Sequence, residues 1–446
     1  MSLVTKTLGE IVAAGGGEIR TGPYGSLLHS RDYSPTGTPV VLPRDIRDGR
    51  VSLQSAARVG PEHVTRLAAH CLEPGDVVYG RRGDLGRRAL VGERETGWLC
   101  GTGCLRIRLG PESAVDPRFL YYYLGLPRLT AWIRGQAVGA TLPNLNSSIL
   151  KSLEVTYPQL PIQRRIVEIL APYDELIANN QERIELLENL VAAVFREWFV
   201  HFRFPGHEKV ALVESPLGEI PTGWTPRQVA DVTRISRGCS YRSAQLAETG
   251  GRLLLTLKCI APGGGFRYDG PKRYTGPYKE SQTARPGDVV MAVTDVSQDR
   301  RVIARVARVP DLGESLAVLT IDLVKILPQV DVSTEYLYGL LRYTHFAEEV
   351  QRHANGANVL HLIPARIGEF RFPLPPRMLI HRYTRFAEPC HDQRDALENQ
   401  NANLRRTRDL LLPKLLAGEL AVSDAHILPT LERPTIEKSR SGSELL

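Results

Sequence analysis

The chain has 446 residues, of which 42% are hydrophobic and 24% charged, a composition typical of globular proteins with two or more domains. No apolar stretch approaches the ~20 residues that span a bilayer, and the first eleven residues contain no signal-peptide core, so we expect a cytoplasmic protein without membrane contact. The formal net charge of +7 is carried mainly by arginine, which is compatible with nucleic-acid binding but does not establish it, because a GC-rich genome also favours arginine.

Cysteine usage argues against a structural metal site. The six cysteines form no CxxC pair, and Cys100 and Cys104 have no second ligand pair at finger-like spacing. Because structural zinc requires four ligands, we interpret the cysteines as buried reduced thiols.

The two halves of the chain repeat the same short motifs in the same order. Residues 74–78 (PGDVV) recur at 286–290, Tyr157-Pro158 recurs as Leu374-Pro375, and Pro172 recurs as Pro389, with the paired positions 212 to 217 residues apart. A run of matches at nearly constant offset indicates a tandem duplication.

In chain order, each half first has a segment of roughly 150 residues with short strand-like runs between turn residues. The predicted strands are residues 38–42, 76–79, 105–109, 253–257, 289–293 and 319–323. These runs predict a mixed module with a curved sheet in each half.

A long helix follows each module. The first has apolar residues at alternating four- and three-residue spacing, with Asn180 as its one polar member, which is typical of a coiled-coil seam. The seam positions are Ile166, Leu170, Tyr173, Ile177, Asn180, Ile184, Leu187, Val191, Val194 and Trp198. We expect Pro172 to start or kink this helix, which would be roughly 43 Å long to about Val200.

The second helix is expected from Pro389 to about Leu416, with a weaker seam. Its predicted seam consists of Leu397, Leu404 and Leu411, alternating with Gln393, Gln400 and Thr407. Two helices of matched length in one chain most simply pack antiparallel.

These observations predict an α+β protein with a pseudo-twofold internal repeat: two tandem mixed α/β domains separated by two long antiparallel coiled-coil helices. The predicted boundaries are 1–160 for the first domain, 161–203 for the first helix, 204–220 for a linker, 221–375 for the second domain, 376–421 for the second helix and 422–446 for a disordered tail.

Several motifs resemble the conserved regions of type I restriction-modification specificity subunits, and the resemblance covers residue 1 to about 421. The motifs are residues 139–146 (GATLPNLN), 158–163 (PQLPIQ), 195–204 (FREWFVHFRF) and 412–420 (LPKLLAGEL). Residues 21–28, 81–87, 237–243 and 294–300 are similar to that family's target-recognition domains. The second half departs from the pattern, because Gly356-Ala357-Asn358-Val359-Leu360 replaces the fuller first-half motif.

The resemblance implies a non-catalytic, sequence-specific subunit of a restriction system. Each target-recognition domain would read one half of a bipartite, asymmetric site on double-stranded DNA, and helices holding the domains roughly 40 Å apart would span about a dozen unread base pairs. Two methyltransferase subunits and restriction translocase-endonuclease subunits would dock on the chain. No cofactor is expected on this chain; S-adenosylmethionine, ATP and magnesium would be bound by the partners.

Basic and polar loop residues are the candidates for DNA binding, because arginine is the commonest partner of guanine and also contacts phosphates. The candidates are Tyr24, Arg44, Arg81, Arg82, Arg87, Arg88, Arg237, Tyr241, Arg242, Lys258, Thr294, Gln298, Arg300 and Arg301. Arg87-Arg88 and Arg300-Arg301 lie 213 residues apart, which suggests matched phosphate contacts. The alternatives are solvated loops for the basic residues and turn packing for the two tyrosines.

Aromatic residues cluster at the end of the first helix. Trp198, Phe199 and Phe202 either pack in a core or dock a partner subunit.

No enzymatic motif accompanies these features. The sequence has no GxxxxGK[ST] phosphate loop, no dinucleotide-binding GxGxxG between strand and helix, no amino-methylation box and no HExxH. Two alternatives remain: a stand-alone nuclease or methyltransferase with an unrecognised active site, and a coiled-coil scaffold without DNA function.

Overall fold

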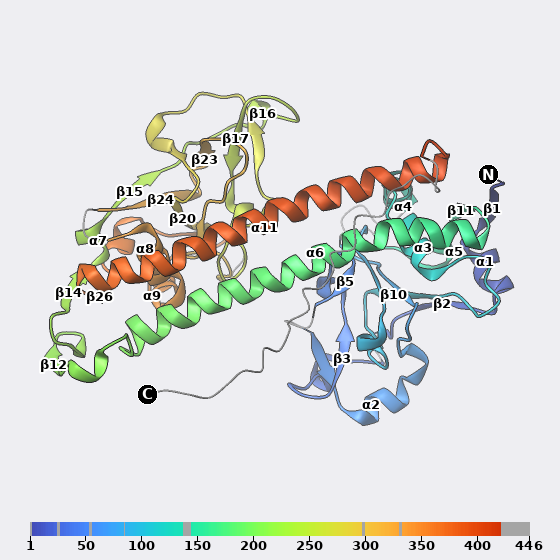
Figure 1. Cartoon of the computed structure of the whole chain (residues 1–446), viewed down its shortest axis with the longest axis horizontal. Helices are drawn as coiled ribbons and strands as arrows, with labels where there is room; N and C mark the ends of the chain where they lie inside the picture. The colour runs from blue at the N-terminus through green and yellow to red at the C-terminus, as the bar shows by residue number, and fades with distance from the viewer. Residues whose placement is uncertain are drawn as a thin grey trace, which may run out of the picture. The chain divides into compact units, whose positions relative to one another are not determined.

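The computed structural model describes residues 2–24, 27–52, 56–83, 85–136, 144–296, 299–329 and 332–420. The chain divides into two compact units (Figure 1): Met1–Ala178 with Ala402–Leu446, and Asn179–Asn401. Two long helices, α6 (Leu160–Phe195) and α11 (Arg377–Ala417), contribute to both units. Each unit therefore contains one sheet module and one segment of each long helix.

The module of the first unit has a four-stranded antiparallel sheet and a three-stranded sheet. The larger sheet has the order β2 (Glu18–Thr21), β10 (Cys104–Arg108), β7 (Val77–Gly80), β8 (Arg88–Leu90), and the smaller has the order β6 (Ala57–Val59), β3 (Thr38–Val41), β9 (Leu99–Cys100). Shorter pairs are β1 (Val4–Thr7) with β11 (Glu154–Tyr157) and β4 (Ile46–Arg47) with β5 (Arg50–Val51). The helices are α1 (Leu8–Ala14), α2 (Pro61–Arg66), α3 (Pro117–Tyr123), α4 (Pro127–Gln136) and α5 (Ser147–Lys151).

The module of the second unit has a similar plan. Its antiparallel sheet has the order β15 (Thr233–Arg237), β24 (Leu323–Pro328), β20 (Val289–Ala292), β22 (Val306–Arg308), and its five-stranded sheet has the order β16 (Leu246–Ala247), β18 (Lys272–Tyr274), β17 (Arg252–Leu255), β23 (Ala317–Leu319), β19 (Thr283–Ala284). Shorter pairs are β12 (Leu212–Ser215) with β13 (Gly218–Pro221), β14 (Thr225–Gln228) with β26 (Arg371–Leu374), and β21 (Thr294–Asp295) with β25 (Leu360–His361). The helices are α7 (Val229–Val232), α8 (Thr334–Tyr343), α9 (Phe346–Val350) and α10 (Ala365–Gly368).

Strand pairing shows that the two modules are structural repeats. Val77 of β7 lies opposite Ile107 of β10, and its repeat Val289 of β20 lies opposite Ile326 of β24. The parallel pair β3 and β9 is matched by the parallel pair β17 and β23. The predicted α+β fold, with an internal repeat and two long helices, is confirmed.

Each module packs its core against the long helices of its own unit. In the first unit, Leu170 of α6 and Leu415 of α11 are fully buried with Phe119 of α3. In the second unit, Phe195 of α6 lies in the core beside α8, where a Cβ on Gly339 would approach the phenyl ring to 2.2 Å. The absence of a side chain at Gly339 thus permits close contact between these two helices.

The long helices pack antiparallel within each unit. In the first unit, Asp174 of α6 forms an ion pair with Arg408 of α11. In the second unit, Asn180 contacts Asn401, and Glu188, further along α6, contacts Arg394, which is earlier on α11. The predicted antiparallel arrangement is confirmed for these segments.

Both helices begin well before the prolines expected to mark them. Pro172 lies inside α6, which starts at Leu160, and Pro389 lies inside α11, which starts at Arg377. Proline removes one backbone hydrogen bond from a helix. Buried neighbours such as Leu170 and Ala387 offset this loss by packing into the cores of their units. Tertiary packing therefore overrides the local signal that suggested a helix start.

The seam predicted for α6 is confirmed, whereas that for α11 is partly wrong. Ile184 and Val191 of α6 are buried, as is Leu397 of α11. However, Gln393, Gln400 and Thr407 are exposed, and the next residue in each case, Arg394, Asn401 or Arg408, faces inward. These inward polar groups are satisfied by hydrogen bonds and ion pairs. Polar residues therefore occupy seam positions for which the heptad pattern predicts apolar residues.

One predicted strand is a turn. In residues 319–323, β23 ends at Leu319 and β24 begins at Leu323, with the chain reversing between them. The alternation of apolar and polar residues in this run imitates a strand, although the burial does not alternate: Thr320 is fully buried and Ile321 is 48% exposed.

The predicted linker and the predicted tail differ in what the structure describes. The expected linker, residues 204–220, contains β12 and most of the hairpin formed with β13. The expected disordered tail, residues 422–446, lies outside the described residues.

Candidate DNA interface

The loops that carry most of the candidate residues of the first unit converge at one edge of its sheets. Strands β2 and β7 end at this edge, where the antiparallel strand β10 begins. Gly22 N donates to Cys104 O over 2.9 Å, and Arg81 N donates to Gly103 O over 2.9 Å. The loops that contain Tyr24 and Arg81–Arg88 therefore lie on either side of the start of β10.

The loop that contains Arg44 reaches the same edge, because β3 runs parallel to β9 and both strands end there. Arg87 Nη1 donates to Pro43 O over 3.5 Å, which places the Arg44 and Arg87 loops in contact. The side chain of Arg44 is 62% exposed. Arg82 and Arg87 are also exposed, as is Tyr24 at 62%. These four side chains can contact a nucleic acid at this edge.

The other two arginines of this loop have internal partners. Arg81 Nε donates to Asn144 Oδ1 over 3.2 Å and to Leu145 O over 3.1 Å. Arg88 Nε donates to Tyr121 O over 2.7 Å, and its guanidinium lies 4.9 Å from the centre of the Tyr121 ring. Both side chains therefore hold the loop in position. The motif residues 139–143, which precede Asn144, lie outside the described residues.

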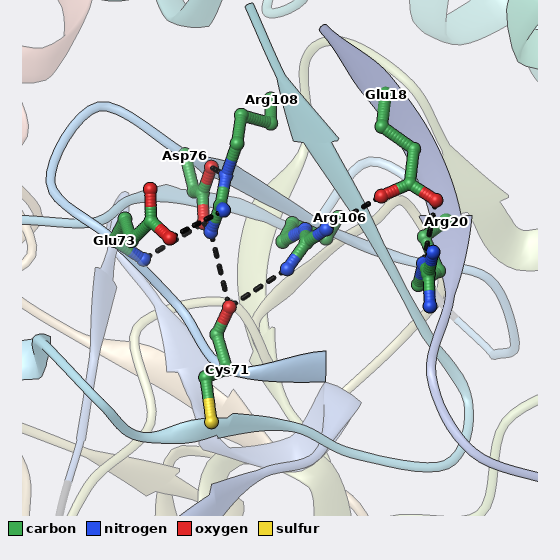
Figure 2. A network of polar contacts seen from close by, with 7 residues as sticks. All are labelled: Glu18, Arg20, Cys71, Glu73, Asp76, Arg106 and Arg108. Carbon is green, nitrogen blue, oxygen red and sulfur yellow. Dashed lines mark hydrogen bonds and ion pairs between the residues drawn. The ribbon is translucent and has the colours of Figure 1, made fainter. Parts of the chain in front are cut away.

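Arginines elsewhere on this sheet are also paired (Figure 2). Arg106 donates to Glu18 over 2.9 Å and to the Cys71 carbonyl over 2.7 Å. Arg108 donates two hydrogen bonds to Asp76, each 2.7 Å, and these bonds raise the pKa of its guanidinium. This network fastens the segment leading into β7 to β10, so these two arginines serve the scaffold.

The second unit repeats the arrangement. Gly238 N donates to Leu323 O over 3.2 Å, so the loop after β15 meets the start of β24 as the Tyr24 loop meets β10. In this loop Arg237 and Arg242 are exposed, whereas Tyr241 is half-buried and packs against the small cluster that includes Tyr274. Lys258 is exposed in the turn after β17.

The loop after β20 differs from what the sequence suggested. Thr294 is buried, 6% exposed, and its hydroxyl donates to Asp322 Oδ1 over 3.0 Å, so its hydroxyl serves the loop rather than base readout. Arg300 donates to the Gln351 carbonyl over 3.2 Å, and Arg301 is exposed with Asp299 at 2.6 Å. Gln298 lies outside the described residues.

The expected correspondence between Arg87-Arg88 and Arg300-Arg301 is wrong. In the first module, Arg88 of β8 lies opposite Tyr79 of β7. In the second module, the residue equivalent to Tyr79 is Met291, and Val306 of β22 lies opposite it. Val306, and not Arg301, is therefore the structural equivalent of Arg88. Seven residues (81–87) connect β7 to β8, whereas thirteen (293–305) connect β20 to β22. The longer connection shifts the alignment, so the basic pairs do not occupy equivalent sites.

The aromatic residues at the end of α6 belong mainly to the core of the second unit. Phe199 is 6% exposed, with its ring 4.9 Å from that of Tyr336 and 5.3 Å from that of Tyr383. Trp198 and Phe202 are half-buried and pack against the same core. Of the three partner-docking candidates, Phe199 is thus a packing residue.

The described cysteines and other potential metal ligands are predicted to form no metal site. Burial raises the pKa of the Cys100 thiol to about 12, and it also raises the pKa of Cys104. Among the residues that the structure describes, no group of three or more His, Cys, Asp or Glu side chains is placed to hold a metal ion. In the same part of the chain, no helix is long and apolar enough to cross a membrane.

A repeated sheet scaffold with basic loops at one edge of each module, joined to paired long helices, is compatible with a DNA-recognition protein. Residues 69–189 match the family model of the type I restriction modification DNA specificity domain. The chain is 24% identical over 324 residues to the type I restriction enzyme MjaIX specificity subunit of Methanocaldococcus jannaschii, covering 70% of this chain and 71% of the relative. It is 21% identical over 409 residues to the HindI specificity subunit of Haemophilus influenzae, covering 79% and 88%.

A solved structure shows the same fold. The S subunit of a type I restriction-modification system from M. genitalium superposes with a TM-score of 0.54 at 16% identity, covering 93% of this chain and 96% of that one. The resemblance seen in the motifs is confirmed: residues 69–189 match the specificity-domain model, and about 70% of the chain is similar to a type I specificity subunit. These subunits are non-catalytic components that recognise DNA sequence.

Proposed function

We propose that the chain reads one asymmetric DNA sequence in two separate parts, one with each module. The observation that supports this is the repeated loop edge. Backbone hydrogen bonds at Gly22 and Gly238 are equivalent in the two modules, while the exposed side chains around them differ. Equivalent scaffolds with different side chains are what the recognition of two different half-sites requires.

Exposed basic residues at each edge supply the contacts. They are Arg44, Arg82 and Arg87 in the first module, and Arg237, Arg242, Lys258 and Arg301 in the second. Contacts to phosphates orient each module, and arginine can read guanine through two hydrogen bonds in the major groove. Arg81, Arg88, Thr294 and Arg300 act indirectly, because they are half-buried or buried and their side chains form hydrogen bonds within the chain.

The paired helices set the number of unread base pairs between the half-sites. α6 has 36 residues and α11 has 41. Buried apolar contacts and hydrogen bonds such as that between Asn180 and Asn401 hold the two helices together. A change in the length of both helices would therefore change the spacer without changing either half-site.

Partner subunits supply the chemistry in this proposal. Two methyltransferase subunits dock on the chain and use S-adenosylmethionine, and translocase-endonuclease subunits use ATP and magnesium. On α6, Leu186 and Leu190 are 62% and 47% exposed and lie four residues apart, so they form an apolar ridge on one helical face. Such a ridge can pack against a helix of a partner, with Trp198 and Phe202 as further candidates.

The test is selection of duplexes from a randomised library by the full chain. We expect two specified blocks separated by a spacer of constant length. The double variant Arg82→Ala, Arg87→Ala should weaken selection of one block only, and Arg237→Ala, Arg242→Ala should weaken the other. A single continuous motif, or loss of the same block in both variants, would contradict the proposal.

Two direct assays address the alternatives. Cleavage or methylation of DNA by the purified chain with magnesium or S-adenosylmethionine would favour a stand-alone enzyme. Absence of binding to any duplex over a series of salt concentrations would favour a scaffold without DNA function.

A further inference from the structure

A four-residue turn, residues 101–104, stands at the recognition edge of the first module and connects β9 to β10. Gly101 N donates to Val41 O over 2.9 Å, and Cys104 O accepts from Gly22 N over 2.9 Å. Cys104 N donates to Gly101 O over 3.1 Å and closes the turn.

The second module has the same turn in residues 320–323, between β23 and β24. Thr320 N donates to Leu255 O over 3.1 Å, Leu323 O accepts from Gly238 N over 3.2 Å, and Leu323 N donates to Thr320 O over 2.9 Å. Each bond has its counterpart in the first module. The two turns are therefore structurally equivalent, position by position.

The residue at the tip of the turn differs between the modules. Thr102 is half-buried, and its hydroxyl donates to Pro23 O over 2.9 Å. The equivalent Ile321 is 48% exposed, although Thr320 and Leu323, the first and last residues of the turn, are fully buried. The turn thus holds an aliphatic side chain outward on a buried, hydrogen-bonded base.

Ile321 lies between two of the recognition loops of its module. Its N–H donates to Cys239 O over 2.8 Å, in the loop that contains Arg242. The adjacent Asp322 accepts from Val293 N over 2.9 Å, in the loop that leads to Val296, which is 74% exposed. An isolated exposed isoleucine is ordinary on a protein surface. Ile321, however, is held on a hydrogen-bonded turn where two recognition loops meet, and this placement is suited to contact with a ligand.

The chemistry of a base pair supplies one. In the major groove, thymine is the only base that presents a methyl group, and apolar side chains read it by contact. An aliphatic side chain cannot exchange hydrogen bonds with the other base edges. We propose that Ile321 reads the 5-methyl group of a thymine in the half-site of the second module, and that the turn tip, Thr102 or Ile321, is a matched specificity position. This inference rests on the function proposed above.

The experiment replaces each thymine of the selected duplex, one at a time, by deoxyuridine, which lacks only the methyl group. For the unmodified chain we expect binding about fourfold weaker at one thymine of the block that Arg237→Ala, Arg242→Ala affects, the factor expected for one buried methylene-sized group. Ile321→Ala should bind the thymine duplex more weakly and show no difference between thymine and deoxyuridine there.

Two control variants separate methyl contact from general damage. Ile321→Val keeps two methyl groups and should retain the deoxyuridine effect. Val213→Ala removes another exposed aliphatic side chain of the same unit, 43% exposed on β12, and should also retain it. Melting temperatures should be unchanged in all three variants, because Ile321 and Val213 are both exposed.

The outcomes distinguish this inference from the proposed function. If two blocks are selected but deoxyuridine has no effect in the second block, or if Ile321→Ala keeps that effect, the reading of thymine by Ile321 is wrong. If no two-block motif is selected at all, the proposed function is wrong instead.

Discussion

The side-chain amide of Asn180 on α6 donates a hydrogen bond to Asn401 Oδ1 on α11 over 3.0 Å, in the helix seam of the second unit. The two residues are 3% and 0% exposed, and the same amide donates to Gln400 Oε1 over 3.1 Å. Neighbouring seam residues such as Ile184 and Leu397 are apolar. A polar layer in an apolar seam favours one register, because a shifted helix would bury amide groups without partners.

Replacing Asn180 should therefore destabilise the second unit. We expect Asn180→Ala to lower the free energy of unfolding by about 1–3 kcal/mol, because the buried Asn401 loses a hydrogen-bond donor. Thermal unfolding followed by circular dichroism measures the effect. Asn179→Ala, the exposed neighbour, is the matched control and should leave the melting temperature unchanged. An equal loss in both variants would argue against the buried layer.

A charged cluster in the first unit should be more sensitive still. Asp174 accepts a hydrogen bond from the Tyr122 hydroxyl over 2.6 Å and forms an ion pair with Arg408, whose side chain is 16% exposed. Arg408→Leu would leave the carboxylate of Asp174 without its cation, and we expect destabilisation of about 3 kcal/mol. Chemical denaturation of this variant and of the exposed neighbour Arg406→Leu tests this. Equal midpoints for the two variants would show that the ion pair contributes little.

Salt dependence should separate exposed from partnered arginines. Arg82→Ala with Arg87→Ala should weaken duplex binding and lower the slope of log K against log salt concentration by about one for each lost phosphate contact. Arg164→Ala, an exposed arginine on α6 outside the loop edge, should leave both quantities unchanged. Binding titrations at several salt concentrations give the slope. An unaltered slope in the double variant would remove these two residues from the interface.

The buried histidine of α11 should make stability depend on pH. Burial, with Arg394 and Arg308 nearby, lowers the pKa of His391 to about 3, and its ring lies 5.5 Å from that of Tyr338. The imidazole is neutral in the folded chain but takes up a proton below pH ~6.5 when unfolded. Since the unfolded state binds more protons, stability should fall as the pH drops below 6.5, by about 1 kcal/mol at pH 5.5.

Melting temperatures at pH 7.5 and 5.5 measure this slope. His391→Leu should reduce the pH dependence, whereas His201→Leu, at an exposed site, should preserve it. A variant at His391 with the same pH dependence as the unmodified chain would assign the slope to other groups.

Periodicity predicted the seam of α6 correctly, because the apolar spacing of a helix is a local property of the chain. It misassigned α11, where Arg394 and Asn401 face inward. These polar residues are tolerated there by partners on another helix, such as Glu188 and Asn180, which no local pattern reveals.

The candidate site shows the same division. Arg81 and Arg82 are adjacent in the sequence and equally plausible as DNA contacts. In the structure, Arg82 is exposed, whereas the side chain of Arg81 donates a hydrogen bond to Asn144, 63 residues away in the sequence. The residue proposed to read thymine, Ile321, lies in a run of alternating apolar and polar residues that resembled a strand. Its equivalence with Thr102 emerges only from the hydrogen bonds of the two turns.

The amino-acid sequence by itself determined the duplicated plan, the two long helices and the resemblance to type I specificity subunits, because repeats, helical periodicity and motifs can be read along the chain. Only the tertiary structure decided which basic residues remain exposed, which polar residues occupy the seams and which loops converge. The physical reason is that burial and hydrogen-bond partners are supplied by residues distant in sequence, as Asn180 and Asn401 illustrate.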